Sequence, residues 1–253
     1  MDKLIQTEFE LNLVHKLDTN DLYPAIKRQN SYYTIKRIMD FSIALVLLLF
    51  LLPFLIIIAI LIHLTSRGPI LYKQERIGAV RVTNNNQPYW KIVTFICYKF
   101  RSMELGADPS IHKAYVSALI NNDITQMDKI QGKASDIRKM VHDPRITRVG
   151  KFLRKFSLDE LPQFWNVLRG EMSLVGPRPA ISYEVEVYKP WHMQRLQATP
   201  GITGLQQIKA RCTEDFDEQV KLDIEYIENQ SIVLDLKICF LTPLVVLNAK
   251  GAL

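Results

Sequence analysis

One stretch of the chain, residues 41–62, carries no charged side chain and constrains the fold more than any other feature. A helix of about 20 apolar residues is long enough to cross the hydrocarbon core of a bilayer, and this stretch meets that length. The mostly polar residues before it exclude a cleavable secretory signal. Pro53 lies near its centre, where a proline removes one backbone hydrogen bond and bends a helix. The sequence therefore predicts a membrane-inserted helix that is broken at Pro53.

Two arrangements of this segment agree with the residues. One is a single kinked helix that crosses the membrane and leaves its flanks on opposite faces. The other is a re-entrant helix–break–helix, in which the irregular backbone must be buried or otherwise satisfied. Basic residues flank both ends, so the positive-inside rule gives no orientation; they are Lys36, Arg37, Arg67, Lys73 and Arg76. These symmetric flanks favour the re-entrant arrangement.

The positive charge of the chain is concentrated in one region. Lys and Arg number 32 and Asp and Glu number 26, which gives a net charge of +6. Residues 133–155, with eight basic and two acidic residues, account for +6 by themselves. Such an excess predicts an anionic partner such as phosphate, nucleic acid or lipid headgroups. No nucleic-acid-binding motif accompanies it, so we expect no nucleic-acid partner.

Part of this basic region has the pattern of an amphipathic helix. Within residues 144–156, Ile146, Val149, Leu153 and Phe156 follow each other at spacings of three and four. Basic residues occupy most other positions, which suits a helix on a membrane surface; an ordinary helix with a solvated face is the alternative. A second apolar run, residues 236–247, is too short to span a bilayer and predicts an interfacial or core helix.

Between the apolar segment and the basic helix, residues 70–143 first show a strand pattern and then a charged helical one. Residues 70–76 and 89–100 are rich in β-forming residues and surround a turn-forming loop at 83–88, which predicts a β-hairpin. Residues 104–143 are charged and predict a surface insertion with helices over 112–120 and 127–140.

Residues 157–179, SLDELPQFWNVLRGEMSLVGPRP, contain adjacent carboxylates and end in a rigid Gly-Pro-Arg-Pro turn. Two interpretations of the carboxylates stay open. Ser157 and Glu160 have the spacing of a capping box, in which both side chains bind helix backbone. Alternatively, Asp159 and Glu160 are the carboxylates that metal-assisted phosphate chemistry requires. Pro162 falls where the first turns of a helix would lie and argues against one continuous helix from residue 158.

This string, together with Lys36-Arg37-x-x-Asp40 before the proline-broken apolar segment, resembles the bacterial sugar transferases, the monotopic polyprenyl-phosphate phosphoglycosyl transferases. The resemblance covers about residues 35–247. It implies an α+β fold: an N-terminal re-entrant membrane helix–break–helix, then a compact, mostly helical cytosolic domain with a small β-hairpin and interfacial amphipathic helices. The implied divisions are a cytosolic tail (1–34), the membrane element (35–66) and the catalytic domain (67–253), with 104–143 as a variable insertion.

The resemblance also implies an activity. Such an enzyme moves a sugar-1-phosphate from a UDP-sugar to undecaprenyl phosphate and releases UMP, through a covalent aspartyl-phosphosugar intermediate. It begins capsule, exopolysaccharide or glycoconjugate synthesis at the bacterial inner membrane, with the catalytic domain on the cytoplasmic face of the bilayer. Whether the chain forms a homo-oligomer stays open. The alternative function is a non-enzymatic membrane tether that binds lipids or a partner, which leaves the joint occurrence of the carboxylates and the Gly-Pro-Arg-Pro turn unexplained.

The residues that match the family's motifs give the expected site. Asp159 is the implied nucleophile, and Glu160 is implied to help hold Mg²⁺. Pro53 matches the membrane break. The residues expected to bind substrate and phosphate are Lys99, Arg154, Arg178, Gln207 and Arg211. The triplet Asp215-Phe-Asp217 is a weak second candidate for a metal site, because triplets this short recur by chance.

Overall fold

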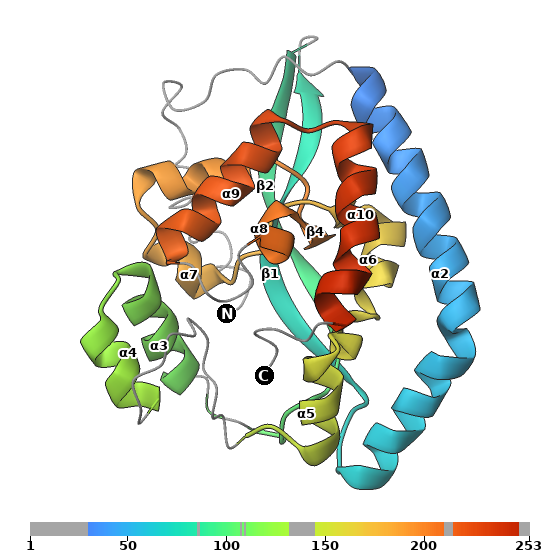
Figure 1. Cartoon of the computed structure of the whole chain (residues 1–253), viewed down its shortest axis with the longest axis vertical. Coiled ribbons are helices and arrows are strands. Elements are labelled where there is room, and N and C mark those ends of the chain that lie inside the picture. Colours follow the sequence, from blue (N-terminus) through green and yellow to red (C-terminus); the bar gives the residue numbers. More distant parts are fainter. Residues whose placement is uncertain are drawn as a thin grey trace.

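The computed structural model describes residues 30–84, 87–106, 108, 110–131, 145–209 and 215–247. Figure 1 shows one long helix, α2 (Asn30–Thr65), along the side of a mostly helical domain that contains a β-hairpin and a small parallel sheet. The predicted α+β class with a predominance of helix is confirmed.

The hairpin consists of β1 (Leu71–Asn84) and β2 (Gln87–Phe100), which pair in antiparallel register from Leu71 opposite Phe100 to Asn84 opposite Gln87. Both strands are longer than the sequence pattern predicts. The apolar core extends the pairing, because Ile77 and Ala79 of β1 are buried and the polar residues beyond them continue the ladder. The hairpin carries Lys99, at the end of β2, into the interior of the domain.

The other elements follow the chain as short helices around the parallel pair β3–β4. They are α3 (Ser110–Ile120), α4 (Ile124–Gln131), α5 (Arg148–Lys155), the 3₁₀ turn η1 (Leu158–Glu160), α6 (Gln163–Arg169), β3 (Ser173–Val175), α7 (Ser182–Glu186), the 3₁₀ segment η2 (Pro190–Leu196), β4 (Gly201–Thr203), α8 (Leu205–Lys209), α9 (Phe216–Glu228) and α10 (Ile232–Leu247).

Helix boundaries differ from the sequence patterns where a cap residue decides them. The helix expected over 144–156 begins at Arg148, because the Thr147 hydroxyl accepts a hydrogen bond from the Gly150 amide at 2.9 Å. The run expected over 236–247 starts earlier, at Ile232, because the Ser231 hydroxyl accepts one from the Leu234 amide at 3.2 Å. The helix expected over 127–140 is described only as far as the end of α4, and the rest lies outside the described residues.

Two of the apolar clusters among the described residues join most of the elements. The first joins α2, α6, β3 and α10 through buried residues such as Ala44, Val167, Val175 and Ile238. The second joins α3 to β1, α7 and α9, and its buried members include Val116 of α3. Helices α3 and α4 lie on the side of the molecule away from α2 (Figure 1).

The predicted break of the helix at Pro53 is not seen: α2 continues through this residue, and Figure 1 shows it as a bent rod. A proline inside a helix costs one hydrogen bond and kinks the axis without necessarily ending it. By length and composition, α2 is the one helix among the described residues that is able to cross a membrane. Its first half packs on the domain through Ala44, and its second half packs through Ile58 and Ile62. Between them lies a run of exposed apolar side chains: Leu45, Val46, Leu49, Phe50, Leu52, Phe54, Ile56 and Ile57.

Candidate active site

The turn that carries the two carboxylates has a specific local cause. After α5 ends, Ser157 adopts a left-handed conformation with φ of 54°, which is uncommon for a residue other than glycine. One 3₁₀ turn follows, and Pro162 then precedes the start of α6. Leu158 and Leu161 pack against the cluster of Phe100 and Leu153, so the chain is turned back onto the domain with Asp159 and Glu160 between them.

The capping-box interpretation is wrong. The Ser157 side chain forms no capping hydrogen bond, because a left-handed residue does not have the extended geometry of an N-cap. The Glu160 carboxylate accepts a hydrogen bond from Lys99 Nζ at 2.7 Å and does not reach back to the helix backbone. The expectation that Pro162 excludes a continuous helix from residue 158 is confirmed.

The Lys99–Glu160 ion pair joins β2 to η1 across 61 residues of sequence. Both side chains are largely withdrawn from solvent, with exposed fractions of 16% and 28%. Asn166 of α6 fixes this geometry, because its side chain accepts a hydrogen bond from the Tyr98 amide at 3.1 Å and donates one to the Ile96 carbonyl at 2.6 Å. The end of β2 is therefore held in register with the helix that follows the carboxylates.

A pocket opens beside this ion pair and brings together four of the residues expected from the sequence: Lys99, Glu160, Arg178 and Gln207. Its remaining lining residues are Arg76, Cys97, Gln163, Pro179, Gly201 and Ile202. The four expected residues come from the end of β2, the 3₁₀ turn, the Gly-Pro-Arg-Pro turn and helix α8. Strands β1 and β4 and helix α6 supply further lining residues.

Arg76 is a site residue that the sequence analysis missed. It is buried on β1 and donates a hydrogen bond from Nη1 to the Pro179 carbonyl at 2.9 Å, which ties the hairpin to the Gly-Pro-Arg-Pro turn. Its Nε has no hydrogen-bond partner among the described residues. An arginine inside a run of β-forming residues was the available signal, since a buried cation in a strand is rare without a partner.

Charge in the pocket acts differently on the two carboxylates. Burial by itself would raise the pKa of Glu160, but the positive charges of Lys99, Arg178 and Arg76 outweigh it and lower this pKa to about 2. Burial and the neighbouring charge of Glu160 raise the pKa of Asp159, and Lys99 and Arg154 oppose that rise only in part. Glu160 is therefore a firmly ionised carboxylate, while Asp159 is a more basic one.

The remaining expected residues are placed as follows. Asp159 is buried, with 8% of its surface exposed, and is not among the residues that line the pocket. Arg154 acts on Asp159 through its charge and donates a hydrogen bond from Nε to the Ser102 hydroxyl at 2.9 Å. The Oε1 atom of Gln207 is buried and has no partner among the described residues, which leaves an acceptor at the pocket. Arg211 lies outside the described residues.

The carboxylates of the Asp215-Phe-Asp217 triplet do not form a metal site. Asp217 binds Lys189 Nζ at 2.7 Å and His192 Nε2 at 3.0 Å, so its oxygens already have partners. In the described part of the chain, no three residues of the types His, Cys, Asp and Glu cluster as metal ligands. Mg²⁺ does not require such a cluster, because it is commonly held by one or two carboxylates and substrate phosphates. The ionised Glu160 at the pocket fits that mode.

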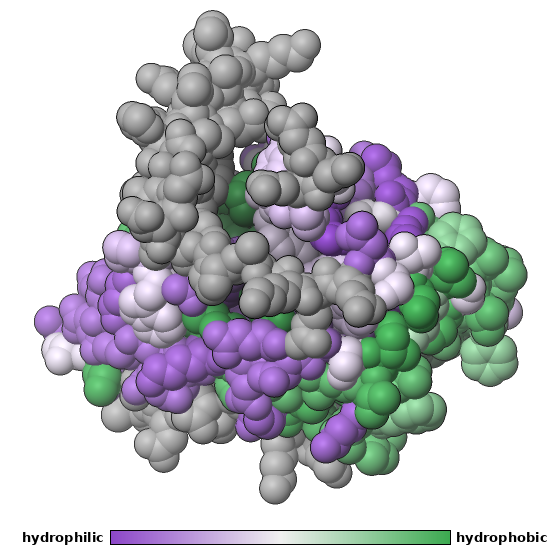
Figure 2. Space-filling model, turned by 90° about the horizontal axis from the view of Figure 1, so that it is seen from above, coloured by the Kyte–Doolittle hydropathy of each residue, from purple (hydrophilic) through white to green (hydrophobic). Residues whose placement is uncertain are grey.

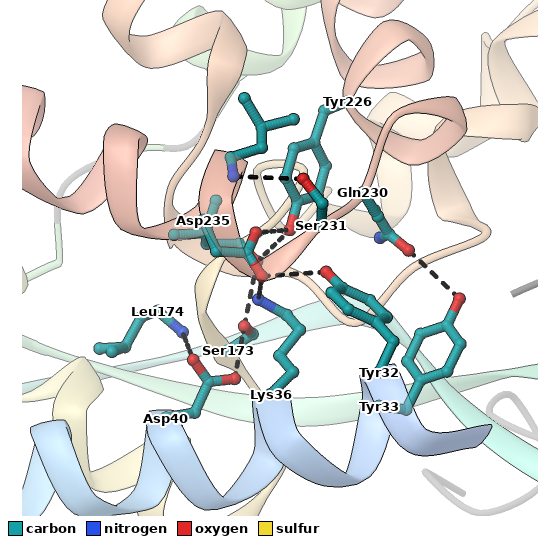
Figure 3. Close-up of polar contacts among 12 residues, drawn as sticks. Tyr32, Tyr33, Lys36, Asp40, Ser173, Leu174, Tyr226, Gln230, Ser231 and Asp235 are labelled. Atoms are coloured by element: carbon teal, nitrogen blue, oxygen red, sulfur yellow. Dashed lines mark hydrogen bonds and ion pairs between the residues drawn. The ribbon is translucent and has the colours of Figure 1, made fainter. Parts of the chain in front are cut away.

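A buried polar network fixes α2 to the domain (Figure 3). Lys36 Nζ lies 2.9 Å from Asp235 Oδ2 of α10, and the same carboxylate accepts hydrogen bonds from Tyr32 and Tyr226 at 2.9 and 2.7 Å. Asp235 is fully buried. A buried charge is tolerated when it is paired and its remaining oxygens are bonded, as they are here.

The same network reaches the strand that leads into the Gly-Pro-Arg-Pro turn. Asp40 of α2 accepts hydrogen bonds from the Ser173 hydroxyl at 2.6 Å and the Leu174 amide at 3.2 Å (Figure 3). The Tyr226 hydroxyl shares its one proton between Asp235 and the Val175 carbonyl, which lies 3.0 Å away. Strand β3 is thus held by both α2 and α9, immediately before the turn that carries Arg178.

A cationic pocket built around an ionised carboxylate, in a domain packed against a helix apolar enough to enter a bilayer, is the arrangement expected of a membrane-associated protein that acts on phosphates. The model of the bacterial sugar transferase family matches residues 31–249, and the chain belongs to that family.

Three relatives illustrate the range of the family. The galactosyl transferase CpsE of Streptococcus agalactiae serotype III is 45% identical over 186 residues, which cover 73% of this chain and 36% of CpsE. The exopolysaccharide production protein ExoY of Rhizobium meliloti is 37% identical over 217 residues, which cover 86% of this chain and 87% of ExoY. The undecaprenyl-phosphate galactose phosphotransferase of Salmonella typhimurium is 41% identical over 185 residues, which cover 73% of this chain and 35% of that enzyme. The chain therefore spans little more than a third of the length of CpsE and of the Salmonella enzyme, and most of the length of ExoY.

Proposed function

We propose that this protein transfers a sugar-1-phosphate from a UDP-sugar to undecaprenyl phosphate and releases UMP, as a first membrane step of exopolysaccharide or capsule synthesis. The names of its relatives support this reaction; a further one, in Escherichia coli, is a UDP-glucose:undecaprenyl-phosphate glucose-1-phosphate transferase. The observation that carries the proposal is the pairing of Glu160 with Lys99, beside Asp159 and in a pocket with Arg178. A tether that only binds lipid has no need for this arrangement.

In the proposed reaction, a carboxylate oxygen of Asp159 attacks the phosphorus atom that bears the sugar. The bond from that phosphorus to the bridging oxygen breaks, and UMP leaves with the bonding electrons. An oxygen of undecaprenyl phosphate then attacks the same phosphorus, and the Asp159 carboxylate is released unchanged. Dividing one displacement into two in this way is the general advantage of a covalent intermediate.

The surroundings of Asp159 suit this role. A carboxylate with a raised pKa is more basic and therefore a better nucleophile, provided that it is ionised at the working pH. The rate at which the covalent intermediate forms should therefore rise as the pH rises through the raised pKa of Asp159. Arg178 and Lys99 offer cationic donors to the diphosphate, and a guanidinium group binds a phosphate through two parallel hydrogen bonds. Glu160 would hold Mg²⁺, which neutralises phosphate charge when bound.

We also propose that α2 enters the membrane from one face and leaves on the same face. Lys36 and Asp40, in its first half, bind α10 and β3, while Ile58 and Ile62, in its second half, pack with Phe100 of the same domain. A straight spanning helix would carry its second end away from that domain. The exposed apolar run between the two halves supplies the inserted part, and Figure 2 shows hydrophobic residues gathered on the side where α2 lies. The catalytic domain would then lie on the cytoplasmic face.

The test is UMP release from UDP-glucose, UDP-galactose and their N-acetyl forms, with Mg²⁺ and undecaprenyl phosphate. We expect lipid-dependent release by the wild type and a loss of at least about 10³-fold in Asp159→Asn, because the attacking oxygen is removed. Asp128→Asn, on α4 and outside the pocket, is the matched control and should keep full activity. Wild-type protein with no acceptor lipid should retain labelled sugar phosphate on the chain. Absence of release with every donor would favour the non-enzymatic tether.

A further inference from the structure

A second cavity lies on the opposite side of α8 from the catalytic pocket. It is a groove of about 460 Å³ between α8, α9 and α10, within the size range of small-ligand clefts. Its lining residues are Leu205, Ile208, Lys209, Glu225, Asn229, Leu234, Lys237, Ile238, Leu241 and Val245. None of these residues lines the pocket around Glu160, so the groove and the pocket are separate sites.

The groove is apolar along its length and positively charged at its edge. Six of its lining residues are aliphatic, and the charged ones are two lysines and one glutamate. Lys209 is paired with Glu225 at 2.8 Å, whereas Lys237 forms no hydrogen bond or ion pair with any described residue. An apolar trough with one uncommitted cation at its rim complements a long hydrocarbon chain that ends in an anion.

The position of Lys237 on α10 places it where the groove meets the exposed surface. At 100° per residue, Leu234, Leu241 and Val245 lie on one side of it. On its other side runs a stripe of exposed apolar residues on the same helix: Val233, Leu236, Phe240, Leu244 and Leu247. The helix that carries this stripe lies beside α2 (Figure 1) and contacts it. The groove therefore borders the surface that faces lipid in the proposed function.

Helix α8 connects the groove to the chemistry. It is only five residues long, and it contributes Leu205 and Ile208 to the groove and Gln207 to the catalytic pocket. Strand β4, which leads directly into α8, contributes Gly201 and Ile202 to the same pocket. A lipid seated in the groove would have its head one short helix away from Gln207.

We propose that this groove binds the isoprenoid chain of the polyprenyl phosphate acceptor, with Lys237 drawing its phosphate end to this side of the domain. The inference rests on the proposed function and names the subsite for its second substrate. The occupant is chosen by charge complementarity: the groove offers a hydrocarbon surface and one free positive charge, and the acceptor is a hydrocarbon chain with one phosphate. The chain of an ordinary phospholipid is the competing occupant.

The experiment separates the two half-reactions. Exchange of labelled UMP into UDP-sugar needs no acceptor lipid and reports the catalytic pocket, whereas transfer to undecaprenyl phosphate also reports the groove. Leu241→Trp fills the groove, and Lys237→Gln removes its free charge. We expect each to raise the KM for undecaprenyl phosphate by about tenfold or more while the exchange rate stays at the wild-type value. Lys237→Arg should restore the KM.

The matched control is Leu244→Trp, which makes the same substitution on the same helix but on the exposed stripe outside the groove. It should leave both half-reactions unchanged. An unchanged KM in both Leu241→Trp and Lys237→Gln, or an equal fall of exchange and transfer, would overturn the groove proposal. Absence of exchange in the wild type would instead refute the proposed function itself, so the two failures are distinguishable.

A labelling experiment identifies the occupant. A photoreactive polyprenyl phosphate analogue should label α10 in the wild-type protein and lose that label in Leu241→Trp. Unlabelled undecaprenyl phosphate should compete for the site, and phosphatidylglycerol at the same concentration should not. Equal competition by phosphatidylglycerol would make the groove a general lipid site and would contradict the proposal.

Discussion

At the scale of single residues, the site depends on two neighbouring carboxylates that have opposite electrostatic surroundings. The charges of Lys99, Arg178 and Arg76 act on Glu160, while Asp159 is buried and feels the negative charge of Glu160. Adjacent carboxylates with pKa values shifted in opposite directions are a recurrent sign of divided chemical roles. Here the ionised residue suits binding of cations, and the more basic one suits attack on phosphorus.

The ion pair makes stability depend on pH in a defined window. The folded-state pKa of Glu160, about 2, lies below its ordinary value of 4.5, so its ionised form stabilises the folded protein above pH 4.5. That contribution is lost as the pH falls from 4.5 toward 2. Glu160→Gln should lower the free energy of unfolding at pH 7 by about 1–3 kcal/mol, because Lys99 is left without its partner.

The measurement is denaturant unfolding in detergent between pH 2 and pH 7. The difference between Glu160→Gln and the wild type should shrink below pH 4.5. Glu218→Gln removes a carboxylate that is half exposed and should show no comparable pH-dependent difference. A Glu160→Gln protein as stable as the wild type at pH 7 would show that the pair contributes nothing to folding.

At the scale of elements, the most consequential contact is the one between α2 and α10. A helix this apolar would be free to tilt in a bilayer, and the Lys36–Asp235 pair gives it a fixed position against the domain. Asp40 extends that contact to β3 and so to the turn that bears Arg178. The site is thereby assembled on an element that is itself anchored to the membrane helix.

Lys36→Met should be strongly destabilising, because it leaves the fully buried Asp235 without a counter-charge. Removing one partner of a buried ion pair costs about 3–5 kcal/mol. The double variant Lys36→Met/Asp235→Leu should recover part of that loss, since the unpaired charge is gone. Chemical unfolding in detergent measures the free energy of unfolding of the single and the double variant.

The control for this prediction is an exposed ion pair on the domain surface. Lys221→Met breaks the pair with Glu218 on α9, where both side chains are in solvent, and should leave stability unchanged. If Lys36→Met were as stable as Lys221→Met, the buried network would not be what holds α2 in place.

At the scale of the whole molecule, both halves of α2 return to one domain, and Figure 2 shows hydrophobic residues gathered on the side where α2 lies. This shape predicts that both ends of α2 lie on the same face of the membrane. The test uses single cysteines at Asn30 and Thr65, both exposed, in a chain whose three native cysteines have been replaced.

A membrane-impermeant maleimide should label both positions in inside-out vesicles and neither in spheroplasts. Labelling of the two positions from opposite sides would establish a spanning helix and refute the re-entrant arrangement. Arg67→Cys, just beyond the helix and also exposed, should follow Thr65→Cys in either case and so controls for local accessibility.

Local patterns in the sequence determined much of this protein. The uncharged run, the hairpin, the amphipathic spacing of α5 and the string from Ser157 to Pro179 depend on neighbouring residues, whose periodicity and backbone preferences act within a few turns. Asp159, Glu160 and Arg178 could be named because the string that carries them is contiguous, whereas Lys99, Arg154 and Gln207 were named from the family resemblance. The cap residues Thr147 and Ser231 then decided where the helices begin.

Only the tertiary structure decided which of those residues meet. The pairing of Lys99 with Glu160, the burial of Arg76 under Pro179 and the contact of Lys36 with Asp235 join positions 61, 103 and 199 residues apart. The left-handed Ser157 likewise follows from packing of Leu158 and Leu161, against the local preference for a capping box. Local propensity is worth a few tenths of a kcal/mol per residue, whereas burying a side chain or pairing a buried charge is worth several times more, so packing overrides it wherever the two conflict.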